Sequence, residues 1–176
     1  MNTALRNSGM ADDFVDRCMA QWSKADERWN AKSLSVAMRI MRLASLFEAR
    51  LDAVARAHKL SVADYDVLAS LRRQPTESLL PKELCKETLL TSGTMTHRID
   101  RLESRGYVKR RPDPSDRRAV RVGLTARGRA LIDKITPQRA QDGEAIASML
   151  TSTRRRQLDE ALRQLLVALD DTEEQT

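Results

Sequence analysis

The hydrophobic period of the chain changes from about 3.6 residues to about 2 just after residue 104, and this change limits the possible folds most strongly. Residues 81–89 predict a short helix with proline in its first turn, and residues 92–104 predict a second helix, capped by Ser92. Residues 107–124 then alternate around a turn-forming stretch at 112–116, which predicts a β-hairpin. Two short helices followed by a hairpin are typical of a winged helix-turn-helix.

Helical periodicity accounts for most of the remaining chain. Only six aromatic residues and six glycines occur, too few for an all-β sandwich. The other expected helices begin near Asp12, Ser33, Ser61, Thr125 and Ser152. Ser61 and Asp64 form a capping-box pattern, and Pro137 is expected to bend or break the helix that Thr125 caps. The predicted fold class is mainly α with a small β-wing.

Both ends of the chain carry apolar patterns that suit a dimer interface. The leading helix has one stripe, made by Phe14, Cys18, Trp22, Ala25 and Trp29. The helix expected over residues 33–58 has a stripe wide enough for burial on more than one side. Near the C-terminus, leucines recur at a spacing too narrow for a monomer core, at Leu158, Leu162, Leu165 and Leu169. We therefore predict a homodimer formed by the N- and C-terminal helices.

The predicted organisation has four parts. They are a leading helix in residues 1–32, a dimerisation helix in 33–60, a winged DNA-binding domain in 61–125, and C-terminal dimerisation helices in 126–176. A symmetric dimer of such domains reads two half-sites, so the expected DNA partner is a pseudo-palindromic operator.

The excess positive charge lies in one segment. Residues 105–129 contain nine basic and two acidic residues, a net charge of +7, whereas the remainder of the chain carries −1. A concentrated basic segment favours a polyanion partner, because each phosphate that is neutralised releases condensed counterions. Its position on the predicted hairpin indicates double-stranded DNA rather than a solvated surface.

Several other classes of protein do not fit. His58 and His97 are the only histidines, and common hydrolase, zinc and nucleotide motifs are missing, so we expect no enzyme activity, metal or cofactor. Two cysteines make no disulfide framework, and no apolar run approaches the roughly 18 residues of a membrane span. A soluble cytoplasmic protein with no membrane partner is expected. A helical scaffold that binds only protein is the third class, and the basic hairpin argues against it.

Residues 80–128, LLPKELCKETLLTSGTMTHRIDRLESRGYVKRRPDPSDRRAVRVGLTARG, resemble the MarR family of bacterial transcriptional regulators. The wing signature is Asp116-Arg117-Arg118 followed by VRVGLTARG, and the resemblance extends from about Ser33 to the C-terminus. It implies that Arg118 enters a minor groove, where negative potential favours arginine, and that Asp116 orients it. It also implies that four residues face the major groove: Ser92, Thr94, Thr96 and His97.

The additional leading helix resembles the urate-responsive branch of this family, of the HucR, PecS and MftR types. That resemblance implies a ligand site made by Trp22, Asp66, Arg98 and Arg110. Urate is a planar purine anion, which an indole face and guanidinium groups suit. Asp66 is expected to pair with one of the two arginines until the ligand competes for it. The implied function is that of a repressor that urate or a related purine releases from DNA. A few members of the family act as activators instead.

Other interpretations of these residues stay open. Trp22 also fits interface packing, and the charged residues also fit structural ion pairs or, for the arginines, phosphate contacts. Phenolic or aromatic carboxylate ligands are an alternative to urate. Oxidation at Cys18 or Cys85 is another, although both lie at apolar helical positions without a basic neighbour that would favour a thiolate.

Overall fold

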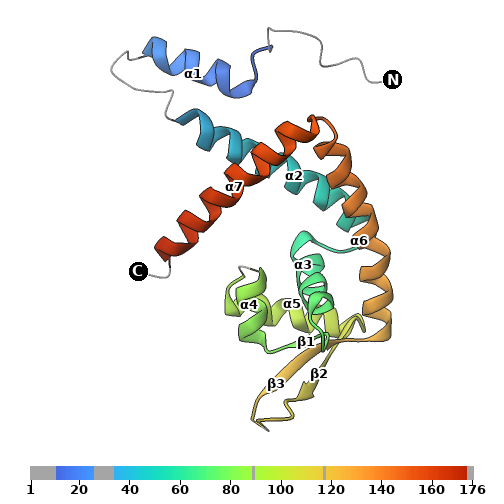
Figure 1. Cartoon of the computed structure of the whole chain (residues 1–176). Helices are drawn as coiled ribbons and strands as arrows, with labels where there is room; N and C mark the ends of the chain where they lie inside the picture. The colour runs from blue at the N-terminus through green and yellow to red at the C-terminus, as the bar shows by residue number, and fades with distance from the viewer. Residues whose placement is uncertain (1–10, 26–33, 89, 117, 174–176) are drawn as a thin grey trace. The chain divides into compact units, whose positions relative to one another are not determined.

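The computed structural model describes residues 11–25, 34–88, 90–116 and 118–173, and it confirms a mainly helical fold with a small sheet (Figure 1). The elements in chain order are α1 (Phe14–Ala25), α2 (Ser35–Ala57), α3 (Val62–Arg73), β1 (Ser78–Leu79), α4 (Pro81–Thr88), α5 (Ser92–Ser104), β2 (Val108–Pro112), β3 (Val120–Leu124), α6 (Ala126–Ala147) and α7 (Ser152–Glu173). The chain divides into two compact units, Met1–Leu51 and Asp52–Thr176, and each is described by itself.

In the first unit, α1 is joined to α2 by charge. Asp13, rather than the predicted Asp12, caps α1, since Asp13 and Asp16 accept hydrogen bonds from each other's backbone N–H groups. Arg39 of α2 donates to the Asp13 carboxylate at 2.8 Å and to the Asp16 carboxylate at 2.6 Å. The hydrogen bond from Arg39 lowers the pKa of Asp13 to about 2. Val15 is the residue of α1 that this unit buries.

The apolar stripe predicted for α1 is open in the single chain. Phe14 is 49% exposed and Trp22 is 45% exposed, while Cys18 is half-buried. Trp29, the last member of the predicted stripe, lies outside the described residues. The helical period was therefore predicted, but the residue buried within the unit, Val15, belongs to another face.

Helices α2 and α7 also present open apolar faces in the single chain. On α2 the exposed large side chains are Val36, Ile40, Met41, Leu43, Leu46 and Phe47. On α7 all four leucines of the predicted seam are exposed. Large exposed apolar faces are typical of surfaces that pack against another molecule.

The second unit has one core, formed where α3, α4, α5 and α6 meet the sheet. The largest fully buried side chains there are Leu68, Leu71, Leu84, Met95, Ile99, Leu102, Ile132 and Ile135. The sheet is antiparallel with strand order β1-β3-β2, and β2 pairs with β3 from Val108 opposite Leu124 to Pro112 opposite Val120. Strand β1, which was not predicted, adds to the other edge of β3. Figure 1 shows the β2–β3 hairpin extending past α4 and α5 as a wing.

The local signals in this unit are largely confirmed. Ser61 and Asp64 form the capping box of α3, and Thr125 caps α6 by accepting from the Gly128 N–H. The cap of α5 is Thr91 rather than Ser92, which is already helical. The expected break at Pro137 does not occur, because α6 continues through this residue to Ala147, and a bend there stays a prediction. One missing N–H removes one backbone hydrogen bond, and full helical turns on both sides of the proline retain theirs.

The described residues contain no helix that is long and apolar enough to cross a membrane. Within the same part of the chain, no group of three or more His, Cys, Asp or Glu residues is arranged to hold a metal ion.

Gly128 of α6 packs closely against the backbone of Tyr107, which directly precedes β2. A Cβ atom at this position would lie 1.9 Å from the backbone oxygen of Tyr107, whereas one at Gly143 in the same helix would meet nothing within 4 Å. We expect Gly128→Ala to lower the free energy of unfolding by about 3 kcal/mol, because the backbone must shift. Gly143→Ala is the matched control and should raise it by about 1 kcal/mol, since alanine favours a helix interior. Thermal unfolding at one protein concentration measures both, and equal effects would contradict the close packing.

Candidate nucleic-acid interface

Helix α5 has one buried face and one open face, as a recognition helix requires. Met95, Ile99 and Leu102 are at most 1% exposed and fix the helix against the core. The four residues predicted to face the major groove, Ser92, Thr94, Thr96 and His97, are all exposed. Hydroxyl and imidazole groups on an open helix face are suited to hydrogen-bond the edges of bases. Their contacts with bases remain a prediction.

Asp64 of α3 anchors the recognition helix. Its side chain is 1% exposed, and it pairs with Arg98 at 3.3 Å and with Arg101. Burial alone would raise the pKa of Asp64, but hydrogen bonds from Ser61 and the charge of Arg101 bring that pKa below its ordinary value. The Asp64 carboxylate therefore stays ionised between two guanidinium groups, and it ties the start of α3 to the middle of α5.

The prediction that Asp66 pairs with Arg98 or Arg110 is wrong, because both arginines pair with other carboxylates of the described residues. Arg98 pairs with Asp64, two residues earlier on α3. Asp66 is half-buried, and burial raises its pKa, opposed by the charges of Arg139 and Arg73. The other predicted ligand residue, Trp22, belongs to the first unit. The described contacts thus do not join the four predicted ligand residues into one cluster.

Arg110 joins the wing to the recognition helix. From strand β2 it pairs with Asp100 at 2.5 Å and with Glu103, both on α5, and its backbone N–H donates to Glu103 at 2.8 Å. The hydrogen bond to Asp100 is the main cause of a raised pKa for Arg110. The interpretation of Arg110 as a structural ion pair, left open by the sequence, is therefore what the single chain shows.

The tip of the wing is ordered through the backbone. The Asp116 carboxylate accepts a hydrogen bond from the backbone N–H of Arg118 at 2.9 Å. Asp116 therefore contacts Arg118 through the backbone N–H and holds the main chain at Arg118 in place. The Arg118 side chain is exposed, and Arg117 lies outside the described residues.

Comparisons with known proteins agree on the nature of this module. A family model described as MarR family matches residues 58–119. The HTH-type transcriptional regulator PecS of Dickeya dadantii is 30% identical over 135 residues, which cover 76% of this chain and 81% of that protein. The chain belongs to the MarR family of transcriptional regulators.

Two solved structures extend this result. Sco3205 of Streptomyces coelicolor, a MarR family regulator in complex with DNA, is 28% identical, with a TM-score of 0.71 over 81% of this chain and 91% of that one. BpsR of Bordetella bronchiseptica, whose DNA binding is regulated by 6-hydroxynicotinic acid, is 28% identical, with a TM-score of 0.65 over 74% and 91%. The winged helix-turn-helix and the DNA-binding class are therefore confirmed, and the relatives are transcriptional regulators rather than enzymes.

The positive charge of this MarR-family module is divided into paired and unpaired groups. Arg110, Arg121 and Arg129 are paired with carboxylates inside the unit. Arg105 and Arg127 each lie 5.0 Å from the centre of the Tyr107 ring. Lys109, Arg111 and Arg118 form no ion pair with any residue that the structure describes. The charge that remains to meet phosphate is thus smaller than the sequence count of +7 implies.

Replacing Arg118 with alanine should weaken binding to DNA while leaving the protein folded. We expect the slope of log affinity against log salt to become shallower by about 0.9 if its guanidinium neutralises one phosphate. Fluorescence anisotropy at several salt concentrations measures this. Arg163→Ala is the control, since Arg163 pairs with Glu160 on exposed α7 and should leave the slope unchanged. An unchanged affinity for Arg118→Ala at moderate salt would remove Arg118 from the interface.

The Asp66 carboxyl gives a stability prediction with a defined sign. Burial raises its pKa, so the folded state disfavours the ionised form, and the resulting loss of stability is present above the folded pKa. Asp66→Asn should therefore raise the midpoint of thermal unfolding at pH 7. The gain should shrink as the pH falls through the folded pKa, and it should vanish below about 3.9, the ordinary pKa of aspartate, where the wild-type carboxyl is mostly neutral in both states. The exposed Asp159→Asn serves as the control, and an equal gain there would contradict the assignment.

Proposed function

We propose that the protein is a homodimeric repressor that binds a pseudo-palindromic operator and releases it when urate or a related purine binds. It would act without a cofactor, on DNA in the bacterial cytoplasm. The observation that carries this proposal is the position of the two predicted ligand arginines. Arg98 joins the recognition helix α5 to α3, and Arg110 joins the wing to α5, each through a carboxylate. A ligand anion would compete for the same guanidinium groups.

The dimer is supported by the open apolar faces of the terminal helices. The exposed residues of α2 and the exposed leucines of α7 form faces that the single chain does not cover among its described residues. A second copy presents the same faces, so a two-fold interface would bury them symmetrically. Two wings and two recognition helices related in this way would match the symmetry of a pseudo-palindromic operator.

Arg98 is suited to receive an anion. Its Nη1 atom lies 2.8 Å from the Ser61 hydroxyl and 3.3 Å from Asp64, while its Nε atom is buried without a hydrogen-bond partner among the described residues. An unsatisfied buried donor is costly, and an acceptor oxygen of a ligand would remove that cost. A cavity of about 310 Å³ lies beside it, lined by Thr94, His97, Arg98 and Arg101.

The ligand would act by competition. An anion that takes hydrogen bonds from Arg98 weakens the pair with Asp64 and hence the joint between α3 and α5. An anion that takes them from Arg110 weakens the joint between the wing and α5. The DNA-bound form needs both joints, so the ligand would favour a different arrangement of these elements, which is the differential interaction that a population shift requires.

The roles of Trp22 and Asp66 follow from the family resemblance alone. Trp22 would stack on the purine from the leading helix. Asp66 would contact the ligand directly instead of holding an arginine, because Asp64 already holds Arg98.

An aromatic carboxylate is the second candidate ligand. The observation that favours it is the similarity to BpsR, whose DNA binding is regulated by 6-hydroxynicotinic acid. Such a ligand carries the same planar ring and anionic oxygens that a guanidinium group recognises. An oxidation signal at Cys18 has no comparable support, since Cys18 is a half-buried free cysteine.

The experiment begins with an operator duplex selected from a random library by the wild-type protein. Fluorescence anisotropy then follows its release by urate, hypoxanthine, salicylate or 6-hydroxynicotinate. Release by urate at concentrations well below those of the other three supports the purine ligand. Preferential release by either carboxylate would replace urate with the second candidate, and release by none would overturn the ligand-responsive part of the proposal.

Arg98→Gln tests the site itself. The variant loses a charge-assisted hydrogen bond, so we expect the urate concentration for half-release to rise by about tenfold or more. DNA affinity without ligand is measured beside it, because Arg98 also anchors α5. Arg72→Gln is the matched control: Arg72 pairs with Asp133 at 2.8 Å, away from the proposed cavity, and should leave the urate response unchanged. An unaltered response in Arg98→Gln would contradict the proposed site.

A further inference from the structure

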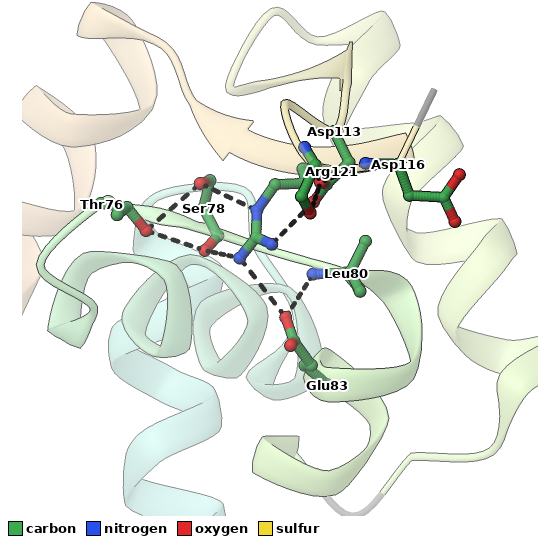
Figure 2. A network of polar contacts seen from close by, with 8 residues as sticks. Thr76, Ser78, Leu80, Glu83, Asp113, Asp116 and Arg121 are labelled. Carbon is green, nitrogen blue, oxygen red and sulfur yellow. Dashed lines mark hydrogen bonds and ion pairs between the residues drawn. The ribbon is translucent and has the colours of Figure 1, made fainter. Parts of the chain in front are cut away.

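Arg121 of β3 lies at the centre of a polar network beside the loop that joins β2 and β3 (Figure 2). Its guanidinium group donates to the Asp113 carboxylate at 2.9 Å and to the backbone oxygen of Ser78 at 3.2 Å. It also lies 3.5 Å from the Glu83 carboxylate and 3.4 Å from the Ser78 hydroxyl. One side chain thus contacts the wing, strand β1 and helix α4.

Glu83 connects this network to the first helix of the helix-turn-helix. Its carboxylate accepts the backbone N–H of Leu80 at 2.7 Å, immediately before α4 begins. This is a capping interaction, which fixes the start of α4. Because the same carboxylate faces Arg121, the position of β3 is coupled to the N-terminus of α4.

Asp113 carries the network toward the tip of the wing. Its side chain is only 5% exposed, and it accepts hydrogen bonds from the Ser115 hydroxyl at 2.5 Å and from the backbone N–H groups of Ser115 and Asp116 at 2.7 and 3.1 Å. The Ser115 hydroxyl, followed by Arg121, lowers the pKa of Asp113 well below its ordinary value. Asp116 in turn accepts the backbone N–H of Arg118 at 2.9 Å.

These contacts form one continuous path from the cap of α4 to the main chain at Arg118. From this geometry we propose that Arg121 is a positioning residue, which sets the wing relative to the helix-turn-helix and so places Arg118 for minor-groove binding. The proposal depends on DNA binding by the family and is independent of the ligand.

Direct contact between Arg121 and phosphate is the competing explanation. Arg121 is 26% exposed and lies between two carboxylates, Asp113 and Glu83, so its charge is already compensated inside the protein. An arginine in this position contributes little to counterion release. Its effect on DNA binding is therefore expected to depend on geometry, and hence on sequence-specific rather than non-specific binding.

The test compares Arg121→Gln with the wild-type protein on two duplexes: the operator selected from a random library, and a random-sequence duplex of equal length. We expect affinity for the selected operator to fall by about tenfold, which corresponds to a displaced base-groove contact. Affinity for the random duplex and the salt slope measured on that duplex should stay within about twofold and 0.3, respectively, because Arg121 itself contacts no phosphate. Arg163→Gln, which removes an arginine paired with Glu160 on α7, should change none of these values.

A double-mutant cycle with Arg118→Ala separates positioning from a merely structural role. If Arg121 acts through Arg118, then Arg121→Gln should change operator affinity by less than about twofold in the Arg118→Ala background. Independent effects of the two changes would overturn the proposal. So would a parallel loss on both duplexes with a slope shallower by about 0.9, which would indicate a phosphate contact.

A second variant guards against a folding defect. Asp113→Asn keeps an acceptor oxygen for the turn but removes the charge that faces Arg121. It should show the same loss of operator affinity, the same retained affinity for random DNA and the same dependence on Arg118. Wild-type operator affinity in a folded Asp113→Asn protein would contradict the path from Arg121 to the wing tip.

Discussion

The buried Asp64 carboxylate is the interaction on which the DNA-reading surface depends. It caps α3 and at the same time holds Arg98 and Arg101 of α5, so one group fixes both the start of one helix and the rotation of the next. Removing an ionised carboxylate from water is costly, and here Ser61 and two guanidinium groups offset that cost. If this carboxylate moved, the apolar contacts of α5 alone would have to keep its open face toward DNA.

The sequence predicted features that are local and missed those that join distant segments. The Ser61 capping box, the helix–hairpin succession and the cap at Thr125 each depend on residues within a few positions of one another. Strand β1 contains two residues, too few to show alternation. The contact between Ser78 and Arg121 spans 43 positions, and no spacing rule predicts it. Family resemblance supplied Arg118, but it says nothing about what holds the wing that carries it.

The choice between Asp64 and Asp66 shows the limit of periodicity. Two residues apart on a helix, their side chains point in directions about 200° apart, so only one of them can face α5. Both are acidic, and the resemblance to the urate-responsive branch favoured Asp66. The structure gives the pair with Arg98 to Asp64, because the first turn of α3 meets α5. Charge counting has the same limit, since it gives the paired Arg121 and the exposed Arg118 equal weight.

Three ion-paired joints surround the recognition elements: Arg98 joins α5 to α3, Arg110 joins the wing to α5, and Arg121 joins the wing to α4. They differ in how readily an anion could enter them. Arg121 has partners at Nε, Nη1 and Nη2, so a ligand would have to displace existing contacts at every position. Arg98 keeps a buried Nε without a partner among the described residues, beside a cavity. An anion that reached the Nε atom of Arg98 would gain a hydrogen bond, whereas at Arg121 it would first have to displace one. A ligand would loosen α5 from α3 while the wing stayed fixed to α4, and the two DNA-reading elements would lose their spacing without either one unfolding.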